Sequence, residues 1–235
     1  MGYRLALAEK PSVAQAIAKV LGASKRCDGY LEGNGWLVSW CVGHLVELAE
    51  PESYDEKYRK WRYEDLPIFP EKWKYEVSPG TRKQFAVVKE LMNRSDVTSW
   101  VLCTDSGREG ELIGRLVYHM CGCPKPFHRL WISSMEDTAI RDGFSNLHPS
   151  SEYDNLYQAA LCRERADWIV GMNVTRLFSL SEPLKNPNLF IWSTVVRSVS
   201  PEKGSDLLLL SGNQRLKTAV IVFPFGAYFG VVFVF

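Results

Sequence analysis

The stretch CTDSGREGE, residues Cys103–Glu111, decides the fold that we expect for this chain. The apolar run Trp100–Cys103 predicts a buried strand before it, and apolar residues at helical spacing follow it over Leu112–Met120. The acidic residues therefore stand where a strand ends and a helix begins, which is where ligands bind in parallel α/β sheets. Asp105 and Glu109 offer the oxygen ligands that Mg²⁺ prefers. Acidic residues also stabilise helix N-termini without any metal, and the motif alone favours that simpler interpretation.

A second junction of the same kind stands near the start of the sequence. The apolar run Leu5–Ala8 predicts a strand, and it leads through Glu9 into a helix that we expect to open with Ser12 as its N-cap and to stop at Gly22. Parallel strands end at the same edge of a sheet. Glu9 and Asp105 are therefore expected to meet at that edge, although they lie far apart in the sequence.

The remaining patterns predict alternating strands and helices. Asn34-Gly35 between two β-prone runs predicts a hairpin, and an apolar stripe predicts a helix over Thr81–Met92. A strand is expected over Phe127–Ile132, and a capping box at the start of Ser134–Phe144 predicts a helix there. A long helix is expected over Glu152–Leu180. This order favours an α/β fold with a parallel sheet covered by helices on both faces.

The composition is that of an ordinary globular protein. The 235 residues are 46% hydrophobic and 23% charged, and the net charge of +1 does not by itself indicate a nucleic-acid partner. No signal-peptide pattern opens the sequence. The six cysteines show no paired metal-ligand spacing. The motif Cys121-Gly122-Cys123 could in principle bind a metal or form a redox pair, but reduced cysteines explain it better without a second cluster. We therefore expect a cytoplasmic protein.

Aromatic and basic residues are interleaved over residues 50–80, where periodicity is weak. This mixture suits single-stranded DNA, because rings stack on bases and cations follow the phosphates. Acidic residues such as Glu64 and Asp65 dilute the positive charge, so composition alone favours a surface loop pinned by aromatic side chains. For the arginines of the predicted helix over Glu152–Leu180, a solvated helix face is likewise the simpler interpretation.

Taken together, the motifs resemble the Toprim domain of type IA DNA topoisomerases, and most closely that of the topoisomerase III branch. The resemblance covers about residues 1–180 and implies a Rossmann-like Toprim domain over residues 1–150, followed by the start of a helical DNA-groove domain over residues 151–180. It rests on segments that occur in the family's order, which are Glu9–Ser12, Gly43–Leu45, Trp61-Arg62, Leu66-Pro67, Thr104–Glu111, Arg129–Ser134 and Ala166–Arg176.

The resemblance also implies a reaction, the Mg²⁺-dependent cleavage and rejoining of one DNA strand through a 5′-phosphotyrosine. Glu9 is implied to handle the proton of the 3′ oxygen, and Lys10 to stabilise the negative charge of the phosphate. Single-stranded DNA is the implied partner, a DNA helicase is a candidate second partner, and no membrane is expected. The implied metal ligands are Glu9, Asp105 and Glu109, with His44 nearby, and the implied DNA contacts are Trp61, Arg165, Trp168, Asn173 and Arg176.

The sequence departs from the family's pattern in three places. Gly107 stands where many Toprim domains carry a second aspartate, and Glu111 is a candidate replacement for the lost ligand oxygen. The nucleophilic tyrosine belongs to a later domain of the family, and none occupies its place here, since Tyr228 lies in an unrelated apolar run. Residues 181–235 form an atypical apolar tail that we expect to lie outside the family fold. We therefore expect a truncated or altered enzyme that is inactive by itself.

Two other functions remain open from the sequence. A different Toprim enzyme, such as a primase or nuclease, would need no tyrosine, although the matches outside the acidic motif argue against it. Metal-dependent nicking that leaves free ends would favour that enzyme. A non-catalytic fragment that binds single-stranded DNA is the other possibility, and binding without dependence on Mg²⁺ would favour it.

Overall fold

The computed structural model describes residues 2–181, 208–209, 219–225 and 228–234. Its internal contacts divide the chain into two compact units, Met1–Leu177 and Phe178–Phe235. The boundaries that the sequence predicts near residues 150 and 180 stay predictions, although the second lies close to this division.

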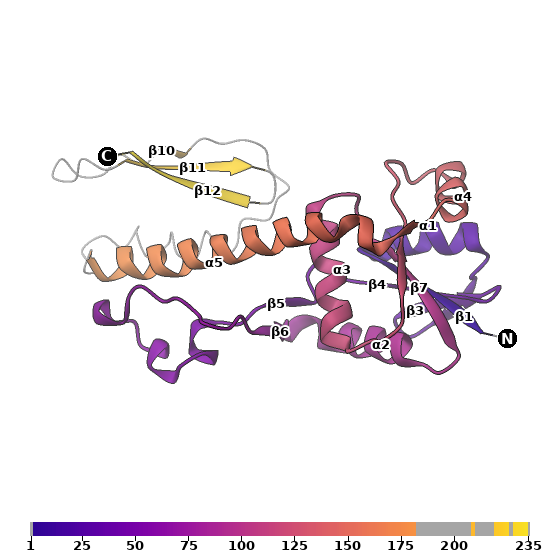
Figure 1. Cartoon of the computed structure of the whole chain (residues 1–235), viewed down its shortest axis with the longest axis horizontal. Coiled ribbons are helices and arrows are strands. Elements are labelled where there is room, and N and C mark those ends of the chain that lie inside the picture. Colours follow the sequence, from indigo (N-terminus) through magenta and orange to yellow (C-terminus); the bar gives the residue numbers. More distant parts are fainter. Residues whose placement is uncertain (1, 182–207, 210–218, 226–227, 235) are drawn as a thin grey trace. The chain divides into compact units, whose positions relative to one another are not determined.

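A seven-stranded mixed sheet forms the centre of the first unit (Figure 1). Its inner four strands run parallel to one another, and antiparallel pairings occur toward its two edges, so the expected parallel sheet is confirmed at the centre. Across the sheet the order is β2 (Lys25–Cys27), β3 (Tyr30–Gly33), β4 (Trp36–Trp40), β1 (Tyr3–Ala8), β7 (Val97–Cys103), β8 (Phe127–Arg129) and β9 (His148–Pro149).

The hairpin between β3 and β4 explains one antiparallel edge. Gly33 pairs with Trp36, and the two residues between them, Asn34 and Gly35, have φ angles of 48° and 76°. Positive φ at both central residues is the geometry of a two-residue type I′ turn. Such a turn can join only antiparallel strands, and the hairpin predicted at Asn34-Gly35 is confirmed.

Helices cover both faces of the sheet, as the sequence predicts. Along β1, Leu5 and Leu7 belong to one apolar cluster, whereas Ala6 and Ala8 belong to the other. The first cluster includes side chains of α2 and α3, and the second includes side chains of α1 and α4. The bounds of these helices are α1 (Pro11–Leu21), α2 (Arg82–Asn93), α3 (Arg108–Cys121) and α4 (Asp137–Ser145).

Two predicted helix starts are wrong in detail. α1 begins at Pro11 with Lys10 as its N-cap, so Ser12 is not the cap. A proline is well suited to this first position, because its fixed φ is helical and its missing N–H would have no helical partner. α4 begins three residues after Ser134, whose Oγ accepts a hydrogen bond from the Glu136 amide at 3.2 Å in the preceding turn. The stop predicted at Gly22 is confirmed by its left-handed φ of 79°.

A second region of this unit joins the long helix α5 (Asp154–Ser181) to residues 46–77. Strands β5 (Val46–Leu48) and β6 (Tyr75–Val77) pair with each other, and the chain between them contains short 3-10 helices (Figure 1). The aromatic and basic segment therefore has little regular structure, as its weak periodicity predicts. Those 3-10 helices are η1 (Pro51–Ser53), η2 (Glu56–Arg59) and η3 (Tyr63–Asp65), and η4 (Pro79–Thr81) and η5 (Ser150–Tyr153) lie elsewhere in the unit.

The described backbone of the second unit forms a small antiparallel sheet. In it, β11 (Ala219–Phe225) pairs with β12 (Tyr228–Val234) on one side and with β10 (Leu208–Leu209) on the other. The expectation that residues 181–235 are foreign to the family fold falls largely on residues 182–207 and 210–218, outside the described residues. Within the ranges that the structure describes, no helix has the length and apolarity needed to cross a membrane.

Candidate metal site and nucleic-acid interface

Two carboxylate-bearing residues meet at the carboxyl edge of the sheet, as the sequence predicts. Ala8 at the end of β1 is the register partner of Cys103 at the end of β7. Just beyond them, the amide of Asp105 donates a hydrogen bond to Oε2 of Glu9 at 3.3 Å. Glu9 is buried, and its Oε1 lies 3.5 Å from the ammonium nitrogen of the exposed Lys10. The edge therefore holds a sheltered carboxylate beside a solvent-facing cation.

The other acidic side chain of this edge is engaged with a histidine. Glu109 lies in the first turn of α3, and its Oε1 is 2.6 Å from Nε2 of His44. Burial by itself would lower the pKa of His44, but the hydrogen bond and charge of Glu109 outweigh it, with smaller contributions from Glu164 and Glu9. The net effect raises the pKa of His44 above its ordinary value. This favours an imidazolium that offsets part of the negative charge at the edge.

The two glycines of the acidic motif differ in what they do. A Cβ on Gly110 would overlap the carbonyl oxygen of Asp105, so only glycine lets α3 pass this close to the loop. Gly107 has a φ of −176°, and nothing lies within 4 Å of the place where its Cβ would be. Extended backbone of this kind is open to any residue. The family's aspartate would therefore fit at Gly107 without strain.

Glu111 is not available as a replacement metal ligand. Its side chain is 0% exposed, and its two oxygens accept hydrogen bonds from Arg115 Nε at 2.7 Å and from Arg129 Nε at 2.9 Å. A buried carboxylate held between two guanidinium groups is a structural anion. The suggestion that Glu111 compensates for Gly107 is therefore wrong.

Arg129 is a buried residue of this edge to which the sequence alone gave no role. Its side chain is 0% exposed and donates to the carbonyl oxygens of Leu102, Thr104 and Leu130 through Nη1 and to that of Asp105 through Nη2. The signal in the sequence was an arginine in a short predicted strand, directly before the apolar Leu130. Such a residue needs a buried anion, and Glu111 supplies it.

The donor groups at the edge fit a hydrated Mg²⁺. Among the described residues, no three His, Cys, Asp or Glu side chains are grouped as a metal site. Mg²⁺ usually keeps several waters and binds through one or two carboxylates. The carboxylate of Asp105 is exposed, and that of Glu9 lies against the same loop. Glu109 is paired with His44, and its role as a third ligand stays a prediction.

Two of the five predicted DNA contacts are used inside the protein. Trp168 is only 8% exposed, donates through Nε1 to the carbonyl of Ala49 at 3.1 Å, and packs edge-on against Tyr54 and Trp73. Asn173 accepts from the amide of Ile68 and donates to its carbonyl. The geometry of both residues favours fastening α5 to residues 49–73.

Of the other three predicted DNA contacts, Arg176 is also buried, at 5% exposed, whereas Trp61 and Arg165 lie nearer to solvent. Arg176 donates to the carbonyl of Tyr58 at 2.8 Å, and its guanidinium lies 5.2 Å from the ring centroid of Trp61. The Trp61 side chain is still 43% exposed. Arg165 is half-buried beside Trp73, with its Cζ 5.5 Å from that ring, and its contact with DNA stays a prediction.

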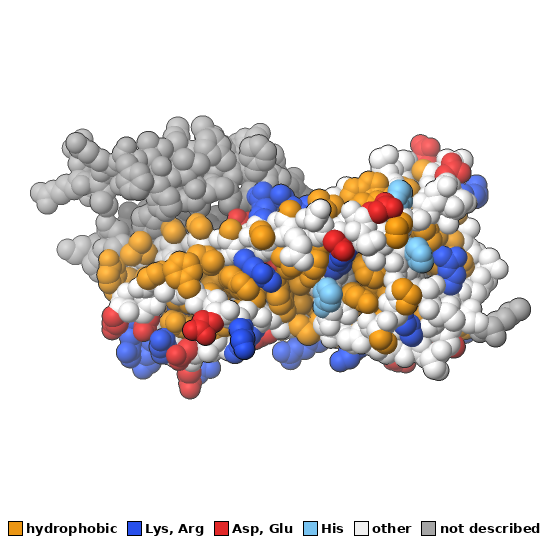
Figure 2. Space-filling view, in the orientation of Figure 1, with side chains coloured by type: hydrophobic (Ala, Val, Ile, Leu, Met, Phe, Trp, Pro, Cys, Tyr) orange, Lys and Arg blue, Asp and Glu red, His pale blue; other side chains and the backbone are white. Residues whose placement is uncertain are grey.

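The structure identifies two exposed aromatic residues that the sequence did not single out. Tyr63 is 64% exposed and Phe69 is 63% exposed, on the same irregular segment as Trp61. Lysine, arginine, aspartate and glutamate side chains are mixed on this part of the surface, at the lower left of Figure 2. The segment thus offers rings to a partner without a purely basic stripe.

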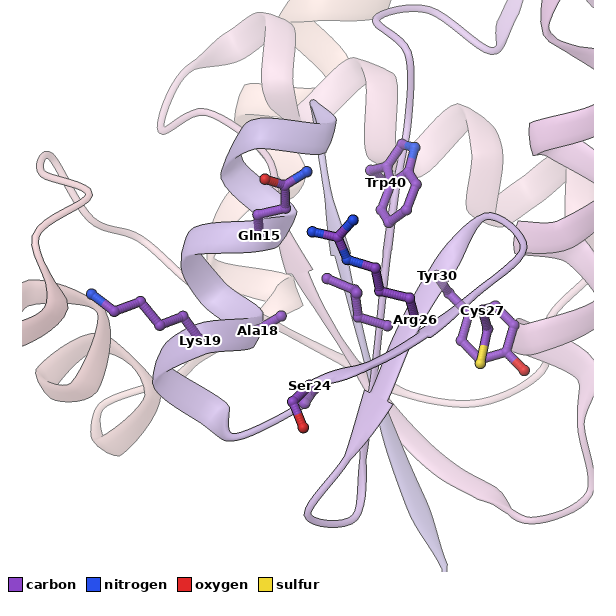
Figure 3. Close-up of a pocket in the computed structure, with 10 residues that line it drawn as sticks. Gln15, Ala18, Lys19, Ser24, Arg26, Cys27, Tyr30 and Trp40 are labelled. Carbon is purple, nitrogen blue, oxygen red and sulfur yellow. The ribbon is translucent and has the colours of Figure 1, made fainter.

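A shallow hollow of about 430 Å³ lies between α1 and strands β2 to β4. Gln15, Lys19, Arg26 and Trp40 are among the side chains around it (Figure 3). None of the predicted site residues lines this hollow. It is therefore separate from the carboxylate edge.

The cysteine pair of the CxC motif is structural in this fold. Cys121 and Cys123 are both free and buried. Burial raises the pKa of Cys121 to about 12, which keeps its thiol protonated. This agrees with the expectation of reduced cysteines in a packed setting.

A known protein family matches the region of the chain that contains the carboxylate edge. The model of the Toprim domain family matches residues 4–135. A solved structure of full-length topoisomerase I from Thermotoga maritima matches with a TM-score of 0.50 at 21% sequence identity, covering 73% of this chain and 25% of that chain. At this identity the likeness speaks for the fold alone.

Closer relatives are found among curated proteins. A protein named DNA topoisomerase 3 from Bacillus anthracis is 52% identical over 176 residues, which are 75% of this chain and 24% of the relative. A protein of the same name from Bacillus subtilis (strain 168) is 50% identical over 176 residues. This chain thus spans about a quarter of the length of the curated relatives that it matches.

Proposed function

Because this chain belongs to the Toprim family, we propose that it is the Toprim part of a type IA DNA topoisomerase of the topoisomerase 3 kind. The observation that carries the proposal is the contact between Glu9 and the amide of Asp105, which are 96 residues apart in the sequence. Two strand ends thereby place a sheltered carboxylate and an exposed one at a single edge. The names of the relatives support the same assignment.

In the proposed reaction, Glu9 gives a proton to the leaving 3′ oxygen during cleavage and takes it back during rejoining. The neighbouring ammonium of Lys10 stabilises negative charge on the phosphate. Glu9 and Asp105 hold Mg²⁺, which when bound supplies charge neutralisation at the 3′ end. The nucleophilic tyrosine is not among the residues that we assign in this sequence.

Single-stranded DNA is the proposed substrate, and its bases stack on the exposed rings of Trp61, Tyr63 and Phe69. Base stacking on an aromatic side chain contributes about 1–3 kcal/mol per base. In this proposal Arg176 orients Trp61, Arg165 offers a cation on α5, and Trp168 and Asn173 hold the segment in place. A cytoplasmic location and a DNA helicase as partner complete the proposal.

Two binding measurements on the 235-residue chain test this function. Calorimetric titration is expected to show weak Mg²⁺ binding that Asp105→Asn removes, and unchanged binding in that variant would move the site away from this edge. Fluorescence anisotropy with a labelled single strand is expected to show weaker binding in Tyr63→Ala and Trp61→Ala. Exposed Lys72→Ala, a charge control without a ring, should weaken binding less than either.

An assay on supercoiled DNA separates this function from its alternatives. We expect no relaxation by the chain alone, because no tyrosine of the resembling segment matches the family's nucleophile. Relaxation that survives Tyr228→Phe would contradict the assignment. Mg²⁺-dependent nicking with free ends would instead indicate a Toprim nuclease, and single-strand binding without any Mg²⁺ response would indicate a non-catalytic module.

A further inference from the structure

The side chain of Arg129 holds the loop that carries Asp105 from inside the protein. Arg129, which is fully buried, donates to the carbonyl oxygens of Leu102, Thr104 and Asp105, so it spans the end of β7 and the start of the loop. The bond to Asp105 is 2.6 Å long. One guanidinium therefore fixes the backbone of the residue that carries the exposed carboxylate.

We propose that Arg129 is a positioning residue that sets the Mg²⁺ affinity of this edge by fixing the backbone of Asp105. The inference rests on the proposed function, since it takes Asp105 as a ligand. Some groups orient a metal ligand without binding the metal themselves. Mutation of such a group commonly changes metal affinity 10- to 100-fold. Arg129 holds the ligand-bearing residue through its main chain and leaves its carboxylate free for the ion.

The chemistry of this position requires an arginine. A guanidinium presents several N–H donors in a rigid plane, whereas a lysine ammonium is a single point with three donors. The Nε of Arg129 is occupied by Glu111, and its Nη1 and Nη2 are thereby aimed at carbonyl groups of the loop and of the adjoining strands. Glu111 thus serves as the anchor of Arg129, which explains why a buried acid follows the exposed ones in the motif.

Arg115 provides a matched control, because it shares the anchor but not the loop. Its Nε donates to the other oxygen of Glu111, and its remaining hydrogen bonds go to Asp154 and to the carbonyl of Ser150. Both arginines belong to one buried ion cluster. A change at Arg115 therefore disturbs the stability of the cluster without removing a hydrogen bond from Asp105.

The test is calorimetric Mg²⁺ titration of the full chain, with folding checked by circular dichroism. Arg129→Lys is expected to weaken Mg²⁺ binding about 10- to 100-fold, whereas Arg115→Lys should change it less than about two-fold. Wild-type affinity in a folded Arg129→Lys variant would overturn the proposal. An equal loss in both variants would also overturn it, because the effect would then belong to the cluster as a whole.

A milder variant decides the matter if Arg129→Lys does not fold. Glu111→Gln keeps an oxygen that can accept from Arg129 but removes the charge that anchors it, so Mg²⁺ affinity is expected to fall by a smaller factor. Affinity unchanged from wild type in that variant would overturn the proposal. If the wild-type chain bound no Mg²⁺ at all, the proposed metal site itself would be overturned. The wild-type titration therefore distinguishes failure of the metal site from failure of the role of Arg129.

Discussion

At Gly110 the helix α3 passes so close to the acidic loop that a methyl group would collide with the carbonyl oxygen of Asp105. Gly107, three residues earlier, has open space beside it and extended backbone. Sequence inspection treats the two glycines alike, as residues that allow a tight turn. Only the structure distinguishes a glycine that the packing demands from one that it merely accepts.

The pair of glycines gives a prediction at the scale of single residues. Gly110→Ala is expected to lower the free energy of unfolding by about 1–3 kcal/mol, because the added carbon forces the loop or the helix to shift. Gly107→Ala is expected to change it by less than about 0.5 kcal/mol. Urea unfolding of the two variants measures both values. Equal stabilities would show that α3 can move away from Asp105 freely.

At the scale of elements, the sequence predicts the interior better than the periphery. The strands of Leu5–Ala8 and Trp100–Cys103 follow from their apolar runs, and their common edge follows from the rule for parallel strands. The parallel centre of the sheet is confirmed, and the antiparallel edge follows from the predicted Asn34-Gly35 turn. The predicted start of α1 was wrong because Pro11 is well suited to the first helical position. Lys10, and not Ser12, is therefore the N-cap.

The roles of aromatic residues around α5 could not be predicted from the sequence. Trp61 and Trp168 both belong to segments that resemble DNA-contacting ones, yet one is 43% exposed and the other 8%. The difference comes from tertiary packing between residues more than a hundred positions apart, since Trp168 donates to Ala49. Such a contact cannot be inferred from the local composition of the sequence.

The hydrogen bond between Glu164 of α5 and Tyr75 of β6 leads to a prediction about how stability depends on pH. Burial raises the pKa of Glu164, and its hydrogen bond from Tyr75 at 3.1 Å and the charge of His44 only partly oppose this. A carboxyl with a raised folded-state pKa contributes stability below its unfolded pKa of about 4.3, and this is lost as the pH rises through the folded value. Glu164→Gln, which cannot ionise, should therefore gain stability relative to wild type as the pH rises above about 4.

Thermal unfolding across this pH range measures the effect. The exposed Glu71→Gln serves as the control, because it removes the same charge without removing a buried carboxyl. A stability difference between Glu164→Gln and wild type that stays constant with pH, or shrinks as the pH rises, would contradict the assigned direction.

At the scale of the whole molecule, the two compact units differ in what they contain. Two apolar clusters lie among the described residues, and the last residue along the chain that belongs to either of them is Leu161. The contact division falls later, between Leu177 and Phe178. The first unit therefore has the means to fold by itself.

Removal of residues 182–235 is expected to leave the first unit folded, because neither described cluster uses them. The chain 1–181 should unfold cooperatively, with a midpoint within about 4 °C of the corresponding transition of the full chain, since about 1 kcal/mol corresponds to such a shift for a domain of this size. Differential scanning calorimetry compares the two. Loss of a cooperative transition in the shorter chain would show that the second unit is needed for the fold.

The sheet order has a consequence for how the carboxylate edge comes into being. Strand β1 lies between β4 and β7, so its second neighbour is made only after about ninety further residues have left the ribosome. Contacts of such large sequence separation require closure of a long loop and tend to form slowly. During synthesis the strand ahead of Glu9 must wait, paired on one side only, for its partner ahead of Asp105. The nascent chain is therefore most open to misassembly at the strand that leads to the carboxylate edge.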